Sequence, residues 1–199
     1  MEDKFLADIA EKFFNLIKDK DLKMPPRVIG FSGINGSGKS TVSDHLKLKG
    51  FLSPSADVLR GILHEIYFDD YDRINSIVID FFSSPYAKDI CKSNNKSIVV
   101  DSNLDRNYEV FFKNYAPITK KPFIIRLDTP EEICLKRLNE REAGNPKRLA
   151  KIIANLPQYI KDHQKFGEKF EDLICYRVTT DITEDILQDI YQKILAHNF

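Results

Sequence analysis

Apolar positions follow two different spacings along the chain, and the two spacings alternate. Runs of adjacent apolar residues, typical of strands buried on both faces, lie at 27–32, 51–55, 97–101, 122–127 and 173–178. Apolar residues recur at every third or fourth position, which is the spacing of helices, over 41–49, 57–67, 71–92, 105–115, 129–142, 147–161 and 183–195. Strands that alternate with helices predict an α/β fold of three layers, with a mostly parallel five-stranded sheet that helices cover on both faces.

A further amphipathic helix is expected before the first strand, over residues 3–19, and Met24-Pro25-Pro26 ends it. The side chains on its apolar face are Phe5, Ile9, Phe13, Leu16 and Ile17. We predict that residues 1–24 pack on one domain formed by residues 25–199. The alternative is a helix that binds another molecule.

The segment Gly33–Ser40 lies between the first strand and the helix that follows it, and it reads Gly-Ile-Asn-Gly-Ser-Gly-Lys-Ser. This is the G-x-x-x-x-G-K-[ST] pattern of the phosphate-binding P-loop. Glycines permit positive φ and bring successive backbone N–H groups near phosphate oxygens, and the following helix presents its positive end. The pattern predicts that the chain binds a nucleoside triphosphate, with Lys39 at the outer phosphates and Ser40 on Mg²⁺. The nucleotide-binding residues expected here are Gly33, Asn35, Gly36, Ser37, Gly38, Lys39, Ser40 and Thr41.

Acidic and basic residues follow the second and third predicted strands, whose carboxyl ends face the P-loop in a parallel sheet. Asp57 can accept a proton from an attacking hydroxyl, and Arg60, one helical turn later, can bind an anion. The alternative is a helix cap with a surface arginine. Asp101 ends the third strand, where an acid orders Mg²⁺ or caps a turn. Residues 102–106, with Asn103 among them, are expected to line the acceptor site.

A basic cluster surrounds the break at Gly144-Asn145-Pro146. Arg137 and Arg141 are four positions apart and therefore share one helix face. On a lid, predicted at about 137–165, they can clamp a transferred phosphoryl group through charge-assisted hydrogen bonds. Lys147 and Arg148 are further candidates, and the alternative is a solvated basic helix end.

These motifs together resemble the polynucleotide-kinase-like group of P-loop kinases, which includes the bacteriophage polynucleotide 5′-kinase domain. The resemblance runs from about Val28 to Tyr159 and is carried by the P-loop, Asp57-x-x-Arg60, Asp101-Ser102-Asn103-Leu104 and Arg137-x-x-x-Arg141. It implies an ATP- and Mg²⁺-dependent transfer of the γ-phosphoryl group to a hydroxyl. The roles that it implies are catalysis for Asp57 (as general base), Lys39 and Arg141, nucleotide binding for Arg137, acceptor binding for Arg60, Asp101 and Asn103, and Mg²⁺ binding for Ser40 and Asp101.

The acceptor stays open on the sequence alone, between a polynucleotide 5′-hydroxyl and a small metabolite or nucleoside. Asp57-x-x-Arg60 is also similar to the Asp-x-Leu-Arg of adenylate-kinase-type nucleoside monophosphate kinases. Those enzymes continue with Asp-Gly-Phe-Pro-Arg after the third strand, where this chain reads Asp-Ser-Asn-Leu-Asp-Arg. A non-kinase switch or ATPase that binds a protein partner through the N-terminal helix is the alternative from another class.

Charge and cysteine content limit the partners and the cellular compartment that we expect for this chain. Thirty Lys and Arg residues balance 30 Asp and Glu residues in a chain of 199, so no global field attracts nucleic acid or membrane. The three cysteines are far apart and beside apolar residues, which predicts buried free thiols in a reducing compartment. The four histidines fall in no ligand or triad spacing and are expected at the surface or in the core. Without an apolar run of about 18 residues or a signal-peptide layout, we expect a cytoplasmic protein that spans no membrane.

Overall fold

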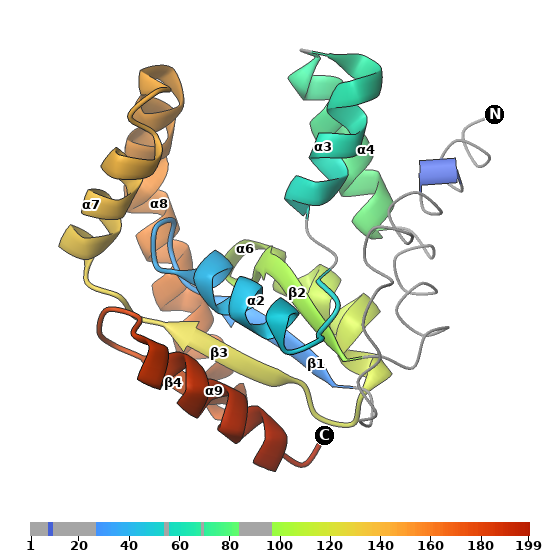
Figure 1. The fold of residues 1–199 in the computed structure, drawn as a ribbon, viewed down its shortest axis with the longest axis vertical. Coiled ribbons are helices and arrows are strands. Elements are labelled where there is room, and N and C mark those ends of the chain that lie inside the picture. The colour runs from blue at the N-terminus through green and yellow to red at the C-terminus, as the bar shows by residue number, and fades with distance from the viewer. Residues whose placement is uncertain (1–7, 10–26, 54–55, 69, 84–96) are drawn as a thin grey trace.

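A sheet of four parallel strands forms the centre of the computed structural model, which describes residues 8–9, 27–53, 56–68, 70–83 and 97–199 (Figure 1). The strand order is β2-β1-β3-β4. The strands are β1 (Val28–Ser32), β2 (Ile98–Asn103), β3 (Phe123–Leu127) and β4 (Ile174–Val178). The predicted α/β class, with a parallel sheet between helices, is confirmed.

The strand predicted at 51–55 is reduced to one isolated bridge. Leu52 pairs in parallel with Ile98, donating its N–H to Ser97 O at 2.9 Å and accepting from Val99 N–H at 2.6 Å. The sequence then reaches Pro54, which has no N–H to donate to a ladder. The described sheet therefore has four strands instead of five.

Helices cover both faces of the sheet (Figure 1). On one face, α2 (Lys39–Leu48) and α9 (Glu184–Ala196) bury Leu46 and Ile190 against Phe31 of β1. On the other face, α6 (Leu104–Val110) and α8 (Pro146–Phe170) bury Leu104 and Phe166 against the sheet. Successive residues of β1 alternate between the two clusters, as the pleat of a strand requires.

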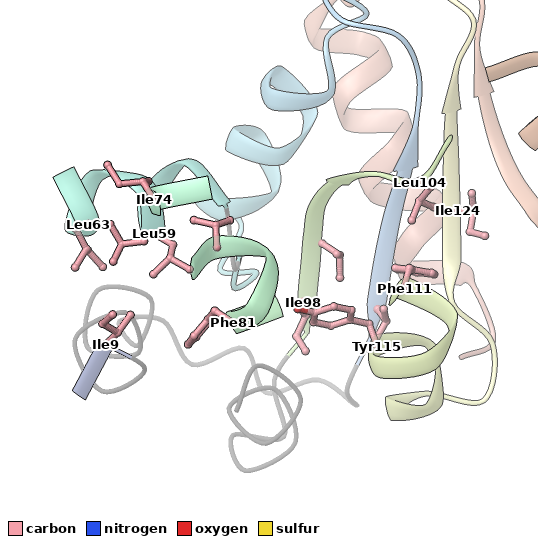
Figure 2. Close-up of a cluster of buried hydrophobic side chains, with 14 of the residues drawn as sticks. Ile9, Leu59, Leu63, Ile74, Phe81, Ile98, Leu104, Phe111, Tyr115 and Ile124 are labelled. Atoms are coloured by element: carbon pink, nitrogen blue, oxygen red, sulfur yellow. The ribbon is translucent and has the colours of Figure 1, made fainter. Parts of the chain in front are cut away.

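The second of these clusters continues from the sheet into a helical hairpin, α3 (Ala56–Tyr67) and α4 (Tyr71–Ser83). Figure 2 shows Leu59 and Leu63 of α3 and Phe81 of α4 in this cluster. Ile9 is also part of it and is 2% exposed. Asp8 and Ile9 are helical, and the rest of the helix predicted at 3–19 lies outside the described residues, as does the predicted helical stretch after Ser83. The packing of residues 1–24 on the domain stays a prediction.

A close contact between α6 and β1 depends on Gly30. A Cβ at this position would lie 2.8 Å from Leu104 Cδ1 and 2.9 Å from the Phe111 ring. The chain continues from α6 through a π-helical turn over Phe111–Tyr115 and a 3-10 turn over Ala116–Ile118. Because α6 packs so tightly on the P-loop strand, its first residues lie beside the start of the loop.

Two helical projections flank the carboxyl edge of the sheet, the α3–α4 hairpin on one side and α7 (Glu131–Arg141) with α8 on the other (Figure 1). The helix predicted at 147–161 is longer than expected: α8 continues through Pro157 to Phe170. Ile152, Leu156 and Phe166 are buried along one face of α8, and their packing offsets the backbone hydrogen bond that a proline removes. None of the described helices is long and apolar enough to cross a membrane.

The cysteine prediction is confirmed in part. Cys134 is buried, Cys175 is only half-buried on β4, and both are free thiols. Burial of Cys175 is incomplete because β4 is the edge strand of the sheet. Cys91 lies outside the part of the chain that the structure describes.

Candidate active site

The P-loop leaves β1 after Ser32 and enters α2 at Lys39. Gly36 and Gly38 have φ angles of +84° and +99°, a region that side-chain-bearing residues rarely adopt. A Cβ on Gly36 would also lie 2.5 Å from Cys134 O of α7. The loop therefore needs glycine here for its own conformation and for the approach of α7.

Gly36→Ala is expected to destabilise the fold by about 1–3 kcal/mol, because it combines strained φ with a backbone clash, and to weaken nucleotide binding. Gly61→Ala is the matched control, because Gly61 lies in α3 with nothing within 4 Å of its would-be Cβ. That change should stabilise the helix by about 0.5–1 kcal/mol. Thermal unfolding with and without ATP measures both effects. Equal stability and equal ATP affinity of the Gly36 variant and the wild type would contradict this account of the loop.

Lys39 lies back across the loop that precedes it. Its Nζ donates to Gly33 O at 2.7 Å and to Ile34 O at 2.9 Å. The ammonium group is thus held over the loop by two backbone carbonyls. Ser40 and Thr41 follow at the start of α2, where the backbone N–H groups of the first turn have no helical partner.

A cavity of about 600 Å³ lies above the loop and is lined from three sides. The P-loop and α2 side consists of Asn35, Gly36, Gly38, Lys39, Ser40 and Thr41. The second side consists of Ala56 and Arg60 of α3, with Asn103 and Arg106 at the start of α6. The third side consists of Arg137, Arg141 and Arg148 of α7 and α8. The structure therefore brings most of the predicted site residues to one cavity.

Among the predicted site residues whose side chains the structure describes, Gly33 and Ser37 are outside this lining. Gly33 donates its N–H to Asp105 Oδ2 at 3.1 Å. Ser37 is fully buried, and its carbonyl accepts from Thr129 Oγ1 at 2.9 Å, so both residues serve the architecture of the loop. The backbones of Asp57 and Asp101 lie in α3 and β2, while their side chains lie outside the described part of the structure, so that their roles stay predictions.

The arginines of α7 and α8 are held in place by acidic and backbone partners. Arg137 donates from one terminal nitrogen to Gly36 O at 3.0 Å and pairs with Asp181 through the other. Glu142, only 5% exposed at its side chain, accepts from Arg141 Nε at 2.8 Å and lies 3.5 Å from Arg148 Nε. One buried carboxylate thus orients two guanidinium groups that line the cavity. The sequence spacing did not reveal Glu142, because its neighbours in sequence are also charged.

Arg60 of α3 and Arg106 of α6 also have partners. Arg60 Nε donates to Asn75 Oδ1 of α4 at 3.1 Å. The Arg106 guanidinium lies 4.4 Å from the centre of the Tyr159 ring of α8, a cation–π contact. Asn103 caps α6 by accepting from Asp105 N–H at 3.0 Å. Such contacts reduce the freedom that these side chains would lose on binding a ligand.

The cavity is strongly cationic. Among the residues that the structure describes, every charged side chain in its lining is basic: Lys39, Arg60, Arg106, Arg137, Arg141 and Arg148. Guanidinium forks and the amide-rich loop are suited to phosphate oxygens. Within the described ranges no group of three or more His, Cys, Asp or Glu residues could hold a metal. The predicted Mg²⁺ donors, the Ser40 hydroxyl and the Asp101 carboxylate, are oxygen ligands of the kind that Mg²⁺ accepts alongside phosphates and water.

Comparison with known proteins identifies a matching family and solved structures of similar fold. The sequence model of the AAA domain family matches residues 29–158, whereas no curated protein matches the chain. A structure of the PezAT toxin–antitoxin system of Streptococcus pneumoniae is similar, with a TM-score of 0.58 at 15% identity over 98% of this chain and 93% of that chain.

Two kinases of small molecules share the fold. Deoxyadenosine kinase from M. mycoides has a TM-score of 0.52 at 16% identity and covers 85% of this chain and 98% of its own. Shikimate kinase from Acinetobacter baumannii has a TM-score of 0.53 at 20% identity, with 86% and 94% covered. These comparisons support the P-loop kinase-like fold, and the finer resemblance to the polynucleotide-kinase-like group stays a prediction. Because the family match spans well over half of the sequence, the chain belongs to the AAA domain family.

Proposed function

We propose that the chain is an ATP-dependent kinase that transfers the γ-phosphoryl group to a hydroxyl of a small, anionic acceptor. The observation that carries the proposal is the cavity, which joins a P-loop to arginines of α7 and α8 and to Arg60 of α3, the helix that lies across the carboxyl edge of the sheet from them (Figure 1). A nucleotide switch needs only the residues that bind the nucleotide, whereas a kinase must also bind an acceptor. The fold is also shared with two proteins named as kinases of small molecules.

The P-loop side and the α7–α8 side together suit a triphosphate. Backbone N–H groups of the loop and Lys39 bind the phosphate oxygens, and Arg137 and Arg141 face the outer end of the tail. When bound through Ser40 and Asp101, Mg²⁺ would neutralise charge on the phosphates. The arginines stabilise charge on the transferred group by position, at little reorganisation cost, because their partners already orient them.

The reaction that we propose needs one base. The acceptor hydroxyl gives its proton to the Asp57 carboxylate, and its oxygen bonds to the γ-phosphorus while the bond from that phosphorus to the β–γ bridging oxygen breaks. ADP then leaves with the electron pair of that bond. Ala56, the residue before Asp57, lines the cavity, so the first turn of α3 is at the right place for this base.

Arg60 and Arg106 suggest the chemical class of the acceptor. Arg60 comes from α3, across the carboxyl edge of the sheet from α7 and α8 (Figure 1), and Arg106 comes from α6 and stacks on Tyr159 of α8. They are best explained by a phosphate or carboxylate group on the acceptor. The cavity volume of about 600 Å³ is within the range of small-ligand sites, about 300–1,000 Å³. We therefore favour a small metabolite or nucleotide-like acceptor over a polymer.

A transfer screen tests the proposal. Labelled ATP is incubated with nucleosides, sugar phosphates, hydroxy acids, nucleoside monophosphates and 5′-hydroxyl oligonucleotides, and the product of each is separated. Label on the hydroxyl of a small anionic compound supports the proposal. Label only on oligonucleotide ends would exclude a small acceptor and indicate a polynucleotide kinase. Label only on the phosphate of a monophosphate would indicate a nucleoside monophosphate kinase. Nucleotide-dependent binding of a protein without any transfer would replace the kinase by a switch.

Arg60→Ala is expected to raise the KM for the acceptor about 10- to 100-fold, the loss of one charge-assisted contact to an anion, and to leave the KM for ATP within about twofold. Arg73→Ala is the control, because Arg73 lies on the partner helix α4 with its guanidinium 4.4 Å from the centre of the Tyr67 ring. Steady-state kinetics with each substrate varied in turn gives both constants. A rise in the ATP constant instead would place Arg60 at the nucleotide.

A further inference from the structure

A largely buried line of charged side chains, which the proposed reaction does not use, lies beside the start of the P-loop. Asp105 accepts from Ser32 Oγ at 2.5 Å and from Gly33 N–H at 3.1 Å. His163 Nδ1 lies 3.1 Å from Asp105 Oδ2, and His163 Nε2 lies 2.9 Å from Asp128 Oδ1. The three side chains come from α6, α8 and the end of β3, so the line joins segments far apart in the sequence.

The contacts define the charge of the imidazole. Ionised carboxylates only accept hydrogen bonds, so both ring nitrogens must carry protons to bond Asp105 and Asp128 together. The Asp105 side chain is 0% exposed and that of His163 is 11% exposed. Burial by itself would lower the pKa of His163, but the hydrogen bonds to Asp105 and Asp128 outweigh it and raise that pKa above its usual value. The contacts and the raised pKa both favour the imidazolium form of His163.

The carboxylates are held in the ionised form by the same contacts. Burial alone would raise the pKa of Asp105, but hydrogen bonds from His163, Ser32 and Gly33 outweigh it and lower that pKa. Burial likewise opposes ionisation of Asp128, yet His163, Arg126 and Arg177 outweigh it and hold its pKa well below the usual range.

Other charged groups surround this line from the neighbouring elements. Arg126 of β3 donates from Nε to Asp128 Oδ1 at 2.7 Å and from a terminal nitrogen to His163 O at 2.9 Å. Arg177 of β4 donates to Asp128 Oδ2 at 2.8 Å and pairs with Glu171. On α8 itself, Asp162 precedes His163, and Lys165 lies two positions after it. The excess of cations around Asp128 means that this carboxylate stays ionised when His163 loses its proton.

A glycine on α8 gives room for this arrangement. A Cβ on Gly167 would lie 2.3 Å from a terminal nitrogen of Arg126. The guanidinium passes directly across the helix at this point, which allows it to reach the carbonyl of His163. The geometry is thus built into the backbone of α8 as well as into its side chains.

The line joins the P-loop to the base of the α7–α8 arm. Asp128 lies just before α7, which carries Arg137 and Arg141, and His163 lies on α8, which carries Arg148 near its start. Thr129 Oγ1 adds a second link by donating to Ser37 O of the loop at 2.9 Å. The bond between His163 and Asp128 holds the two helices of the arm together, and the bond between His163 and Asp105 holds them to Gly33.

We propose that His163, as an imidazolium, is a positioning residue that sets the distance between the phosphate-binding loop and the arginines of the α7–α8 arm. The inference rests on the proposed kinase function for its effect on turnover. When His163 loses a proton, one of its two carboxylate bonds must break. If Nδ1 loses it, Ser32 Oγ, 3.1 Å from Nδ1, can donate to that nitrogen only by giving up its own bond to Asp105. The loop and the arm are no longer held at one distance.

The pH dependence has a defined sign. A pKa that is higher in the folded chain than in the unfolded chain stabilises the fold fully below about 6.5 and loses that effect as pH rises through the folded value. The lowered pKa values of Asp105 and Asp128 add stability that is lost only in acid, below about 4. Stability, ATP affinity and turnover should therefore share a decline on the alkaline side, and the decline should be absent when His163 is replaced.

Two substitutions separate the two bonds. The amide nitrogen of asparagine takes the place of Nδ1, so His163→Asn keeps a donor for Asp105, and that of glutamine takes the place of Nε2, so His163→Gln keeps a donor for Asp128. We expect His163→Asn to keep ATP affinity within about twofold and to lower turnover about tenfold. We expect His163→Gln to weaken ATP binding about tenfold, the size of one lost buried charge-assisted bond.

Three measurements make the test independent of the acceptor. Proton–nitrogen spectra of the wild-type imidazoles, assigned with the variants, report whether both nitrogens of His163 carry protons. Calorimetric titration with ATP across pH measures ATP affinity, which reports on the loop and needs no phosphoryl transfer. Once an acceptor is known, turnover across pH reports on the position of the α7–α8 arm. Glu168→Gln, an exposed change on the same helix, is the control and should match the wild type.

The outcomes are distinct. Doubly protonated His163, with an alkaline decline in ATP affinity that both variants lack, supports the inference even if no acceptor is ever phosphorylated, which would sink only the kinase proposal. A neutral His163 at pH 7, or the same pH dependence in wild type and variants, would overturn it. If one variant fails to fold, the other variant and the wild-type spectrum still decide.

Discussion

Replacing Lys39 by alanine is expected to abolish measurable phosphoryl transfer, with turnover lowered at least about 10³-fold, the size expected when a charge that stabilises the transition state is lost. The ammonium is the one lysine charge among the described residues that line the cavity, and it is already held over the loop by Gly33 O and Ile34 O. Its loss removes charge compensation at the outer phosphates and also two contacts that fix the loop. Labelled-phosphate transfer under saturating ATP is the measurement.

Two matched variants give this result its meaning. Lys47→Ala removes a lysine from the same helix whose ammonium lies 2.8 Å from Asp44 Oδ1, and it should keep full turnover. Lys39→Arg keeps the charge but replaces a compact ammonium by a planar fork, so it should remain strongly impaired. Full activity of the Lys39→Ala variant, with an unfolding temperature like the wild type, would exclude the role of the P-loop in the reaction.

The parts of the site that sequence reasoning found are those whose requirements are local. The P-loop residues, including Lys39 and Ser40, follow one another in a fixed pattern. Because the strands are parallel, the carboxyl ends of the neighbouring strands lie at the same edge of the sheet as this loop. Arg137 and Arg141 could be paired because a helix places residues four apart on one face. Local spacing was enough to bring these to the cavity lining that the structure shows.

The parts that it missed depend on long-range packing. His163 is 58 residues from Asp105 and 35 from Asp128 in sequence, and none of these spacings has a local signature. The histidines were expected at the surface or in the core, and His163 is buried, but no sequence pattern indicates the charged groups that surround it. The strand expected at 51–55 failed for a related reason, since whether an apolar run pairs along its length depends on the neighbour it meets.

Asp57→Asn is expected to lower turnover by about 10²–10⁴, the contribution of a general base, while ATP affinity stays within about twofold. Asparagine has nearly the same shape but cannot take the proton of the acceptor hydroxyl, so only the step after both substrates are bound should suffer. Single-turnover transfer with ATP and acceptor in excess, beside calorimetric titration of ATP alone, separates the two. Unchanged turnover would remove Asp57 from the mechanism.

The control for that change comes from the neighbouring helix. Asp72 lies in the first turn of α4, so Asp72→Asn removes an equivalent charge from a helix N-terminus, where acids are stabilising, without approaching the cavity. If both variants lose turnover equally, the effect belongs to the hairpin and not to proton transfer. The comparison with Lys39 also separates classes of protein: a switch whose nucleotide is bound by the P-loop loses binding in the Lys39 variant and is indifferent to Asp57. Only a kinase whose acceptor meets the nucleotide beside α3 requires both residues, one for the phosphates and the other for the proton.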